Sequence, residues 1–151
     1  MSNDYTQFSC DFFLSSKEEK DWWSSILSVD IERLSVKEPD NFDKFEIIAS
    51  AILDGAGYWS FESEVDEDDN QIWFHADESG DPYELAKLIY AFFSEFRADQ
   101  DSTFFFTWAE TCSTMQSDAF SGGTIAVTKD GIGVCAVNDQ YRFAKSNIKK
   151  P

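Results

Sequence analysis

Residues 54–81 concentrate the side chains of this chain that could do chemistry. The segment contains ten carboxylates, five aromatic rings and one histidine, and it has no lysine or arginine. Carboxylates at this density could ligate a hard cation, transfer protons, or present negative charge to a basic partner. Because the chain has 29 aspartates and glutamates, some carboxylate pairs are expected by number alone. Pairing by itself therefore does not indicate glycosidase-type catalysis.

A calcium site is the first chemistry to consider. Asp66, Asp68 and Asn70 have the spacing of the first ligands in an EF-hand loop. The pattern then departs from that loop, because Gln71 stands where the sharp turn needs glycine and Asp77 stands where the bidentate glutamate belongs. We therefore expect a solvated acidic turn, with no metal site and no cofactor.

Catalysis by a nucleophile or a general base is the second chemistry to consider. His75 is the only histidine, and thiol catalysis would require it to lie beside a cysteine such as Cys112. No segment matches a phosphate-binding loop, a dinucleotide-binding fingerprint or a serine-hydrolase elbow. We expect that the protein is not an enzyme and has no catalytic residue. A small enzyme or ligand-binding module that uses the Trp108–Cys112 region and His75 remains an alternative.

The elements that position these residues are predicted from the periodicity of apolar side chains. Residues 58–65 and 71–77 alternate between apolar and polar types on either side of the acidic turn at 66–70, which predicts a β-hairpin with one buried and one acidic face. Residues 29–41 fit neither the helical nor the strand period. The other predicted elements are strands at 5–14, 103–110, 124–128 and 132–137, and helices at 17–28, 42–53 and 82–97.

Helix ends have their own signals. Ser16 followed by Glu19 predicts a capping box at the first helix. Asp81 before Pro82 predicts a capped start for the third, and Gly55 predicts the end of the second.

The sequence also makes predictions about several aromatic and glycine residues. The adjacent Trp22 and Trp23 lie on an apolar helical stripe and are expected to pack in the core. Phe105 points to the opposite face of its strand from its aromatic neighbours, which predicts that both faces are partly covered there. Gly122 and Gly123 allow a bulge or a close approach of two backbones.

The order of these elements predicts the α+β class. Strands joined by short turns and interrupted by helices favour a mainly antiparallel sheet of about five to six strands, with two to three helices packed on one face. We expect one domain at residues 1–143, followed by a basic flexible tail at 144–151.

Charge limits the kind of partner. The chain has a net charge of −17, with twelve acids and no base between Lys44 and Lys87, whereas residues 129–151 hold five bases and two acids. A local asymmetry of this kind favours a one-sided acidic face, although the acids could serve only to keep the protein soluble. Direct binding of nucleic acid or of an anionic membrane by that face is excluded.

The expected compartment is the cytoplasm. Three widely spaced cysteines suit free thiols better than a disulfide framework. The first residues do not resemble a signal peptide, and no apolar run reaches the roughly 20 residues that cross a bilayer.

A phosphate-like surface is the functional hypothesis that the acids favour. Alternate residues of a strand repeat every ~6.6 Å, and phosphates of a DNA strand rise ~3.4 Å each, so offset carboxylates on two neighbouring strands could imitate a phosphate row. Such a surface would occupy the basic groove of a nucleic-acid-binding protein, with exposed rings as anchors. The candidate partner-binding residues are Trp59, Glu62, Glu64, Asp66, Glu67, Asp68, Asp69, Trp73, Asp77, Glu78 and Asp81.

Residues 104–128 contain a longer pattern, in which an F-x-W-A-x-T-C-S run is followed by an acid, two glycines and a strand. The residues that match are Phe106, Trp108, Ala109, Thr111, Cys112, Ser113, Asp118, Gly122 and Gly123. The pattern resembles a family of small acidic proteins from bacteriophages and mobile elements, and the similarity covers residues 71–128. Residues 114–116 depart from it, since a basic, proline-containing stretch is expected there. This setting implies an anti-CRISPR or anti-restriction inhibitor, although the resemblance carries no activity of its own.

An immunity protein for a nuclease toxin would use the same acidic surface and remains an alternative. The oligomeric state is not predicted by the sequence.

Overall fold

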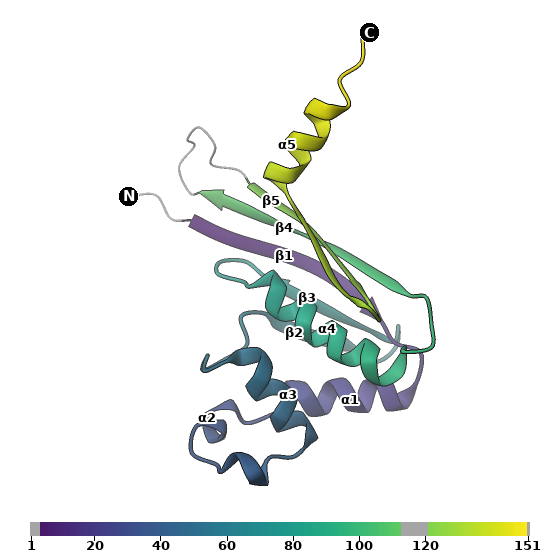
Figure 1. The fold of residues 1–151 in the computed structure, drawn as a ribbon. Coiled ribbons are helices and arrows are strands. Elements are labelled where there is room, and N and C mark those ends of the chain that lie inside the picture. Colours follow the sequence, from purple (N-terminus) through teal and green to yellow (C-terminus); the bar gives the residue numbers. More distant parts are fainter. Residues whose placement is uncertain (1–3, 113–120, 151) are drawn as a thin grey trace.

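A computed structural model describes residues 4–112 and 121–150 (Figure 1). Within these residues the chain forms one sheet of six strands. The strands lie in the order β2-β3-β1-β4-β5-β6, and each neighbouring pair is antiparallel. Their bounds are β1 (Asp4–Phe13), β2 (Glu62–Asp66), β3 (Gln71–Ala76), β4 (Thr103–Cys112), β5 (Ser121–Thr128) and β6 (Gly131–Ala136).

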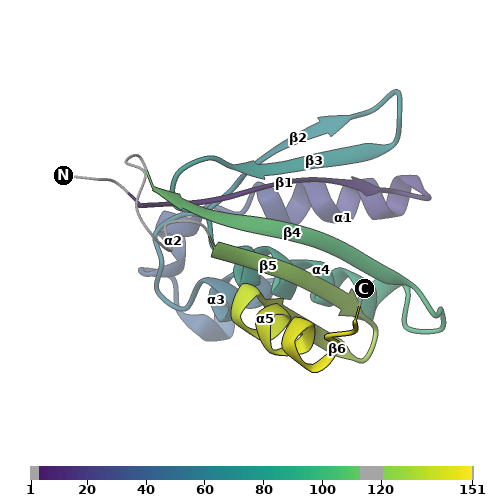
Figure 2. The ribbon, with the colours of Figure 1, turned by 90° about the horizontal axis from the view of Figure 1, so that it is seen from above.

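The longer helices form one layer against this sheet. Helices α1, α3 and α4 lie on the same side of the strands, whereas α5 projects on the other side at the β6 edge (Figures 1 and 2). We call that other side the open face. This architecture confirms the predicted α+β class and the mainly antiparallel sheet covered on one face. The helices are α1 (Lys17–Leu27), α2 (Ile31–Leu34), α3 (Lys44–Leu53), α4 (Pro82–Phe96) and α5 (Val137–Ser146), with a 3-10 turn at Pro39–Asn41.

The core lies between the sheet and the helical layer and is rich in aromatic rings. Phe12 of β1 is almost fully buried and meets Trp23 of α1 and Phe92 of α4 in edge-on contacts, with centroids 5.6 Å and 5.3 Å apart. Trp22 is also buried and packs edge-on against Trp23. The prediction that the tryptophan pair packs in the core is therefore confirmed.

The predicted starts of α1 and α4 are confirmed, with one change of hydrogen-bond partner at α1. The Ser16 hydroxyl accepts a hydrogen bond from the Glu19 amide, but the Glu19 carboxylate accepts from the amide of Ser15 instead of that of Ser16. The Asp81 carboxylate accepts from the amides of Tyr83 and Glu84, which caps α4 as expected.

Helix α3 differs from its prediction at its start. It begins at Lys44, two residues later than expected, because Asp43 forms a complete capping box with Glu46. At the other end, Asp54 takes the left-handed conformation at φ +47°, and Gly55 follows at φ +92°. The predicted end of the helix is correct, but an aspartate shares the positive-φ turn with the glycine.

The C-terminal segment is the clearest departure from the sequence prediction. Strand β6 ends at Ala136 and α5 follows directly through Ser146, so the expected boundary at residue 143 falls inside a helix. The segment is polar and basic and its mean hydropathy is low, which is why the sequence suggested a flexible tail at residues 144–151 and no helix, although its few apolar residues recur at helical spacing.

The open face corrects a second expectation. Phe105 was predicted to be partly covered, but it lies on the open face of β4 and is 64% exposed. The predicted close approach at Gly122 is confirmed, because a Cβ atom there would lie 2.2 Å from the carbonyl oxygen of Trp108.

A largely buried ion pair joins three elements at one end of the core. The Arg97 guanidinium, just after α4, donates to the Glu19 carboxylate of α1 at 3.1 Å and to the carbonyl oxygen of Phe13 at 3.1 Å. It also lies over the rings of Phe12 and Phe92, with Cζ 5.3 Å and 5.2 Å from their centroids. The charge of Arg97 is thus satisfied on its edge by a carboxylate and on its faces by aromatic rings.

Replacing Arg97 by alanine should lower the free energy of unfolding by about 3–5 kcal/mol, because the Glu19 carboxylate would stay buried without its cation. Chemical denaturation followed by tryptophan fluorescence measures this loss. Lys44→Ala is the matched control, since it breaks the exposed pair between Lys44 and Glu95 and should cost within about 1 kcal/mol. Equal losses in the two variants would contradict the role given to Arg97.

Candidate partner-binding surface

Strand β2 presents acids on the open face. Glu62, Glu64 and Asp66 are paired with His75, Trp73 and Gln71 of β3 respectively, and directly opposed residues of an antiparallel pair point to the same side. The side chains of Glu62 and Glu64 are 83% and 67% exposed. The predicted hairpin and its acidic face are therefore present.

The turn after β2 holds further acids. The Asp66 carboxylate accepts hydrogen bonds from the amides of Asp68 and Asp69 at 3.0 Å and 3.2 Å, so Asp66 shapes the turn as well as contributing charge. Glu67, Asp68 and Asp69 are exposed. Asn70 closes the turn with φ +53°.

Asp11 of β1 belongs to the same surface, although the sequence analysis did not select it. It is paired with Trp73 on the side of β3 away from β2, so Glu64, Trp73 and Asp11 form one row across three strands. A shallow hollow of about 650 Å³ is lined by Trp73, Gln71, Val65 and five carboxylates, those of Asp11, Glu64, Asp66, Glu67 and Asp68. We call Asp11, Glu62, Glu64 and Asp66 the acidic face.

Trp73 stands at the centre of the acidic face. Its indole N–H donates to the Ser9 hydroxyl at 2.7 Å, and its ring stacks on the His75 imidazole with centroids 3.9 Å apart. The side chain is nevertheless 40% exposed and lines the hollow. The His75 Nε2 atom lies 3.8 Å from a carboxylate oxygen of Glu62 and of Glu64, so a protonated imidazole would be held by both acids.

Strand β3 does not supply the second row of acids that the sequence analysis suggested. Its residues on the open face are Gln71, Trp73 and His75, and only Asp77, just past its end, is acidic. The charge beside β2 comes instead from Asp11, which lies two strands away.

The remaining predicted residues lie around the far end of the hairpin. Trp59, Glu62, His75, Asp77 and Glu78 line a second, smaller hollow. The Trp59 ring is half-buried and packs on Phe61 with centroids 5.7 Å apart, which leaves less of it exposed than of Trp73. Asp81 is exposed, but its carboxylate is engaged as the cap of α4.

The described residues do not bring His75 and Cys112 together. His75 is opposite Ser9 of β1, whereas Cys112 is opposite Asp4, five residues along the same strand, which corresponds to roughly 17 Å. The two residues also belong to opposite faces of the sheet, because Cys112 shares the parity of the buried Phe106. Within the described ranges, no group of three or more histidine, cysteine, aspartate or glutamate side chains is arranged to hold a metal ion.

A shallow apolar groove crosses the open face beside the acidic face. It is lined by Gln7, Ser9, Trp73, His75, Thr107 and the Trp108–Ala109 stretch, and Cys112 is not part of it. The groove therefore joins His75 to the Trp108 region without a nucleophilic thiol.

Comparison of the chain with protein-family models, with curated proteins and with solved structures gives no match. In residues 4–112 and 121–150, no helix combines the length and the apolar character needed to span a bilayer. Ser113 and Asp118, which contribute to the sequence resemblance, lie outside the described residues.

Thiol chemistry can distinguish the core-facing side of β1 from the open face of β6. Burial, together with the smaller effect of the Asp11 charge, raises the pKa of the Cys10 thiol from 9.0 to about 12. A pKa above the working pH keeps the thiol protonated, so Cys10 should resist alkylation at about pH 8, whereas the exposed Cys135 should react. Mass-spectrometric mapping of alkylated peptides measures both rates, with urea-unfolded protein as the control. Equal rates for Cys10 and Cys135 in the folded protein would contradict this assignment of faces.

Proposed function

We propose that the protein is an acidic inhibitor that binds the basic groove of a nucleic-acid-handling protein in the cytoplasm. Its carboxylates would take the place of nucleic-acid phosphates, and an anti-CRISPR or anti-restriction role suits this action best. The observation that supports the proposal is the convergence of Asp11, Glu62, Glu64 and Asp66 on one uncovered sheet face around an exposed tryptophan.

The spacing of these acids suits a partner that normally tracks a phosphate backbone. Glu62 and Glu64 are two residues apart on one strand, which gives about 6.6 Å, close to twice the ~3.4 Å rise of phosphates along one DNA strand. A single strand therefore offers a carboxylate for every second phosphate. Such a surface acts mainly on the association rate and on specificity, because its field extends about 8–10 Å at cellular salt.

Trp73 supplies binding affinity that the charges alone do not. Surface carboxylates are well hydrated, and each contributes little net affinity. An exposed indole that is already held by Ser9 and His75 loses little conformational freedom on binding. We therefore assign Trp73 as the anchor and the surrounding acids as the steering charges.

The groove beside Trp73 favours a second candidate, a small ligand-binding module. It joins His75 to the Trp108 region, as that alternative requires. A planar apolar ligand bound there would change the fluorescence of Trp73 at any salt concentration, whereas the inhibitor function predicts binding that high salt abolishes.

The inhibitor function is tested by affinity capture from the host at low and high salt, followed by binding measurements with the captured protein. The triple variant Asp11→Lys, Glu62→Lys and Glu64→Lys should weaken binding at least about tenfold and slow association, because it reverses the steering charge. The control Asp21→Lys, Glu38→Lys and Asp40→Lys makes the same change in net charge at exposed positions of the helical layer and should bind as the parent does.

The captured protein must also release its own nucleic acid when the inhibitor binds. Binding that survives the triple reversal, or that leaves the nucleic acid in place, would contradict the proposal. A captured nuclease toxin encoded beside this protein would identify it as an immunity protein.

Trp73→Ala should weaken the same complex by about 2 kcal/mol or more, and mainly through faster dissociation, because it removes the anchor and leaves the steering charges in place. Tyr90→Ala, at an exposed ring on α4, is the matched control. Surface plasmon resonance separates the two rate constants. A loss confined to the association rate would exclude Trp73 as the anchor.

A further inference from the structure

The two edges of the sheet differ in charge. At the β2 edge, all three residues on the open face are acids, namely Glu62, Glu64 and Asp66. At the β6 edge, the residues on the open face are Gly131, Gly133 and Cys135, and the whole strand, GIGVCA, is uncharged. Edge strands are normally protected from pairing with another chain by charge, proline or a bulge, and β6 has a regular register with neither proline nor charge.

The helical layer also covers β6 only in part, although Ile132 packs against the core. Helix α4 packs mainly against β5, and Val134, which faces the helical side of β6, is 50% exposed. An apolar side chain and an unprotected strand edge are thus left open at the same place.

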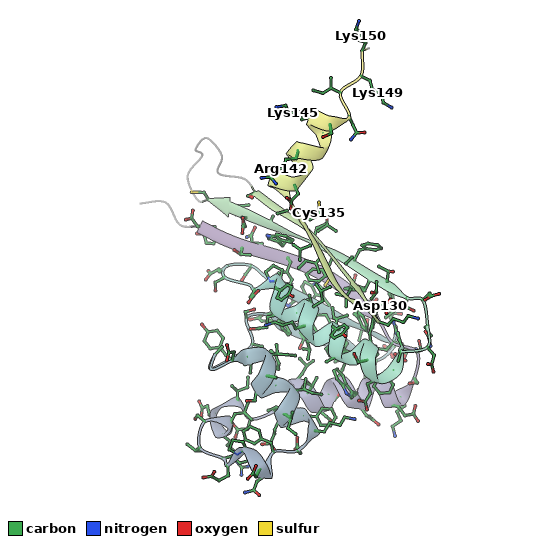
Figure 3. The ribbon with its side chains drawn as sticks, viewed as in Figure 1. Asp130, Cys135, Arg142, Lys145, Lys149 and Lys150 are labelled. Carbon is green, nitrogen blue, oxygen red and sulfur yellow. The ribbon has the colours of Figure 1, made fainter. Side chains whose placement is uncertain are left out.

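A basic arm follows β6 directly. Helix α5 projects beyond the sheet, and Arg142, Lys145, Lys149 and Lys150 extend from it and from the residues after it (Figure 3). All four side chains are exposed. With Lys129 they give residues 129–151 five bases against two acids, in a chain whose net charge is −17.

The strand order places this arm at the same end of the sheet as the acids around the start of β2. Successive neighbours are antiparallel, so β3 and β6 run in the same direction and both end where β2 begins. Glu62, Asp77 and Glu78 lie at that end on the β2 side, and α5 lies at that end on the β6 side. One edge of the molecule is therefore complementary in charge to the other.

We propose that the chain associates head to tail, with the β6 edge of one copy pairing antiparallel with the β2 edge of the next. The sheet then continues from copy to copy with α1, α3 and α4 of every copy on one side, and the basic arm of one copy meets Glu62, Asp77 and Glu78 of its neighbour. The two strands have six and five residues, so nearly their full lengths can pair. A contact between unlike surfaces does not close on itself after two copies, so it yields oligomers that grow with concentration.

The net charge opposes this association only at long range. Charges more than about 8 Å apart are largely screened at physiological salt, so the local contact between the basic arm and the acidic edge decides the sign of the interaction. The association should therefore be strongest at intermediate salt, because very low salt restores the repulsion between the acidic bodies and high salt screens the arm.

Gly133 offers a direct test of the pairing. Its φ is not positive, and a Cβ atom there meets nothing within 4 Å, so a side chain can be added without strain. Every open-face residue of β2 is an acid. Any pairing register that keeps the open faces of the two copies on the same side therefore places Gly133 beside a carboxylate of the neighbouring copy. If the middle of β6 pairs with the middle of β2, the residue opposite Gly133 is Glu64.

The experiment is sedimentation velocity with the full chain over a range of protein and salt concentrations. The parent protein should show a weight-average mass that rises with concentration beyond that of a dimer. Gly133→Glu should weaken association, Gly133→Lys should preserve or strengthen it, and their dissociation constants should differ by about tenfold because the cross-strand pair changes from repulsive to attractive. Combining Gly133→Glu with Glu64→Lys should restore association, since it rebuilds the pair with exchanged signs.

Ala51→Glu, at an exposed position of α3, carries the same net charge as Gly133→Glu and should associate as the parent does. Circular dichroism establishes that each variant is folded before it is compared. A parent that stays monomeric at every concentration and salt, an assembly that stops at a dimer, or equal behaviour of the two Gly133 variants would overturn the proposal.

Discussion

All of the surface chemistry of this molecule depends on one constraint, which is that helices α1, α3 and α4 all cover the same face of the sheet. Alternate residues of each strand then point either to the buried side of the sheet, here called dry, or to the solvent-exposed side, here called wet. On β1 the even positions hold Phe8 and Phe12 in the core, and the odd positions place Asp11 in water. The acidic face exists because the same division places three acids of β2 on the wet side beside Asp11.

This constraint also explains how the chain tolerates its charge. Like charges on β2 repel one another, and a face covered by protein would make that repulsion prohibitive. In water it is screened within about 8 Å. The buried carboxylates of the described residues each have a partner: Glu19 is paired with Arg97, where hydrogen bonds and aromatic rings surround the ions, and Glu84 accepts a hydrogen bond from the Ser60 amide. Charge and core are thus kept in separate layers of one small domain.

Local features of the fold and of the site could be predicted from the sequence, because alternation and capping act over a few residues. The hairpin, the shared face of Glu62 and Glu64, and the cap at Asp81 are of this kind. Asp11 was missed because its contribution depends on β1 lying next to β3, and strand order is a property of the whole chain. Helix α5 was missed because its pattern is polar and basic, and the exposure of Phe105 because nothing local indicates which sheet face is covered.

The parity division of the strands has an evolutionary consequence. Substitutions at wet positions such as Asp11, Glu62 and Glu64 do not alter the buried contacts, so they change the acidic face at little cost to folding. A lineage that must follow a changing target can therefore vary one half of each strand while selection preserves the other half. The sheet is in this respect a scaffold whose specificity and stability can evolve almost independently.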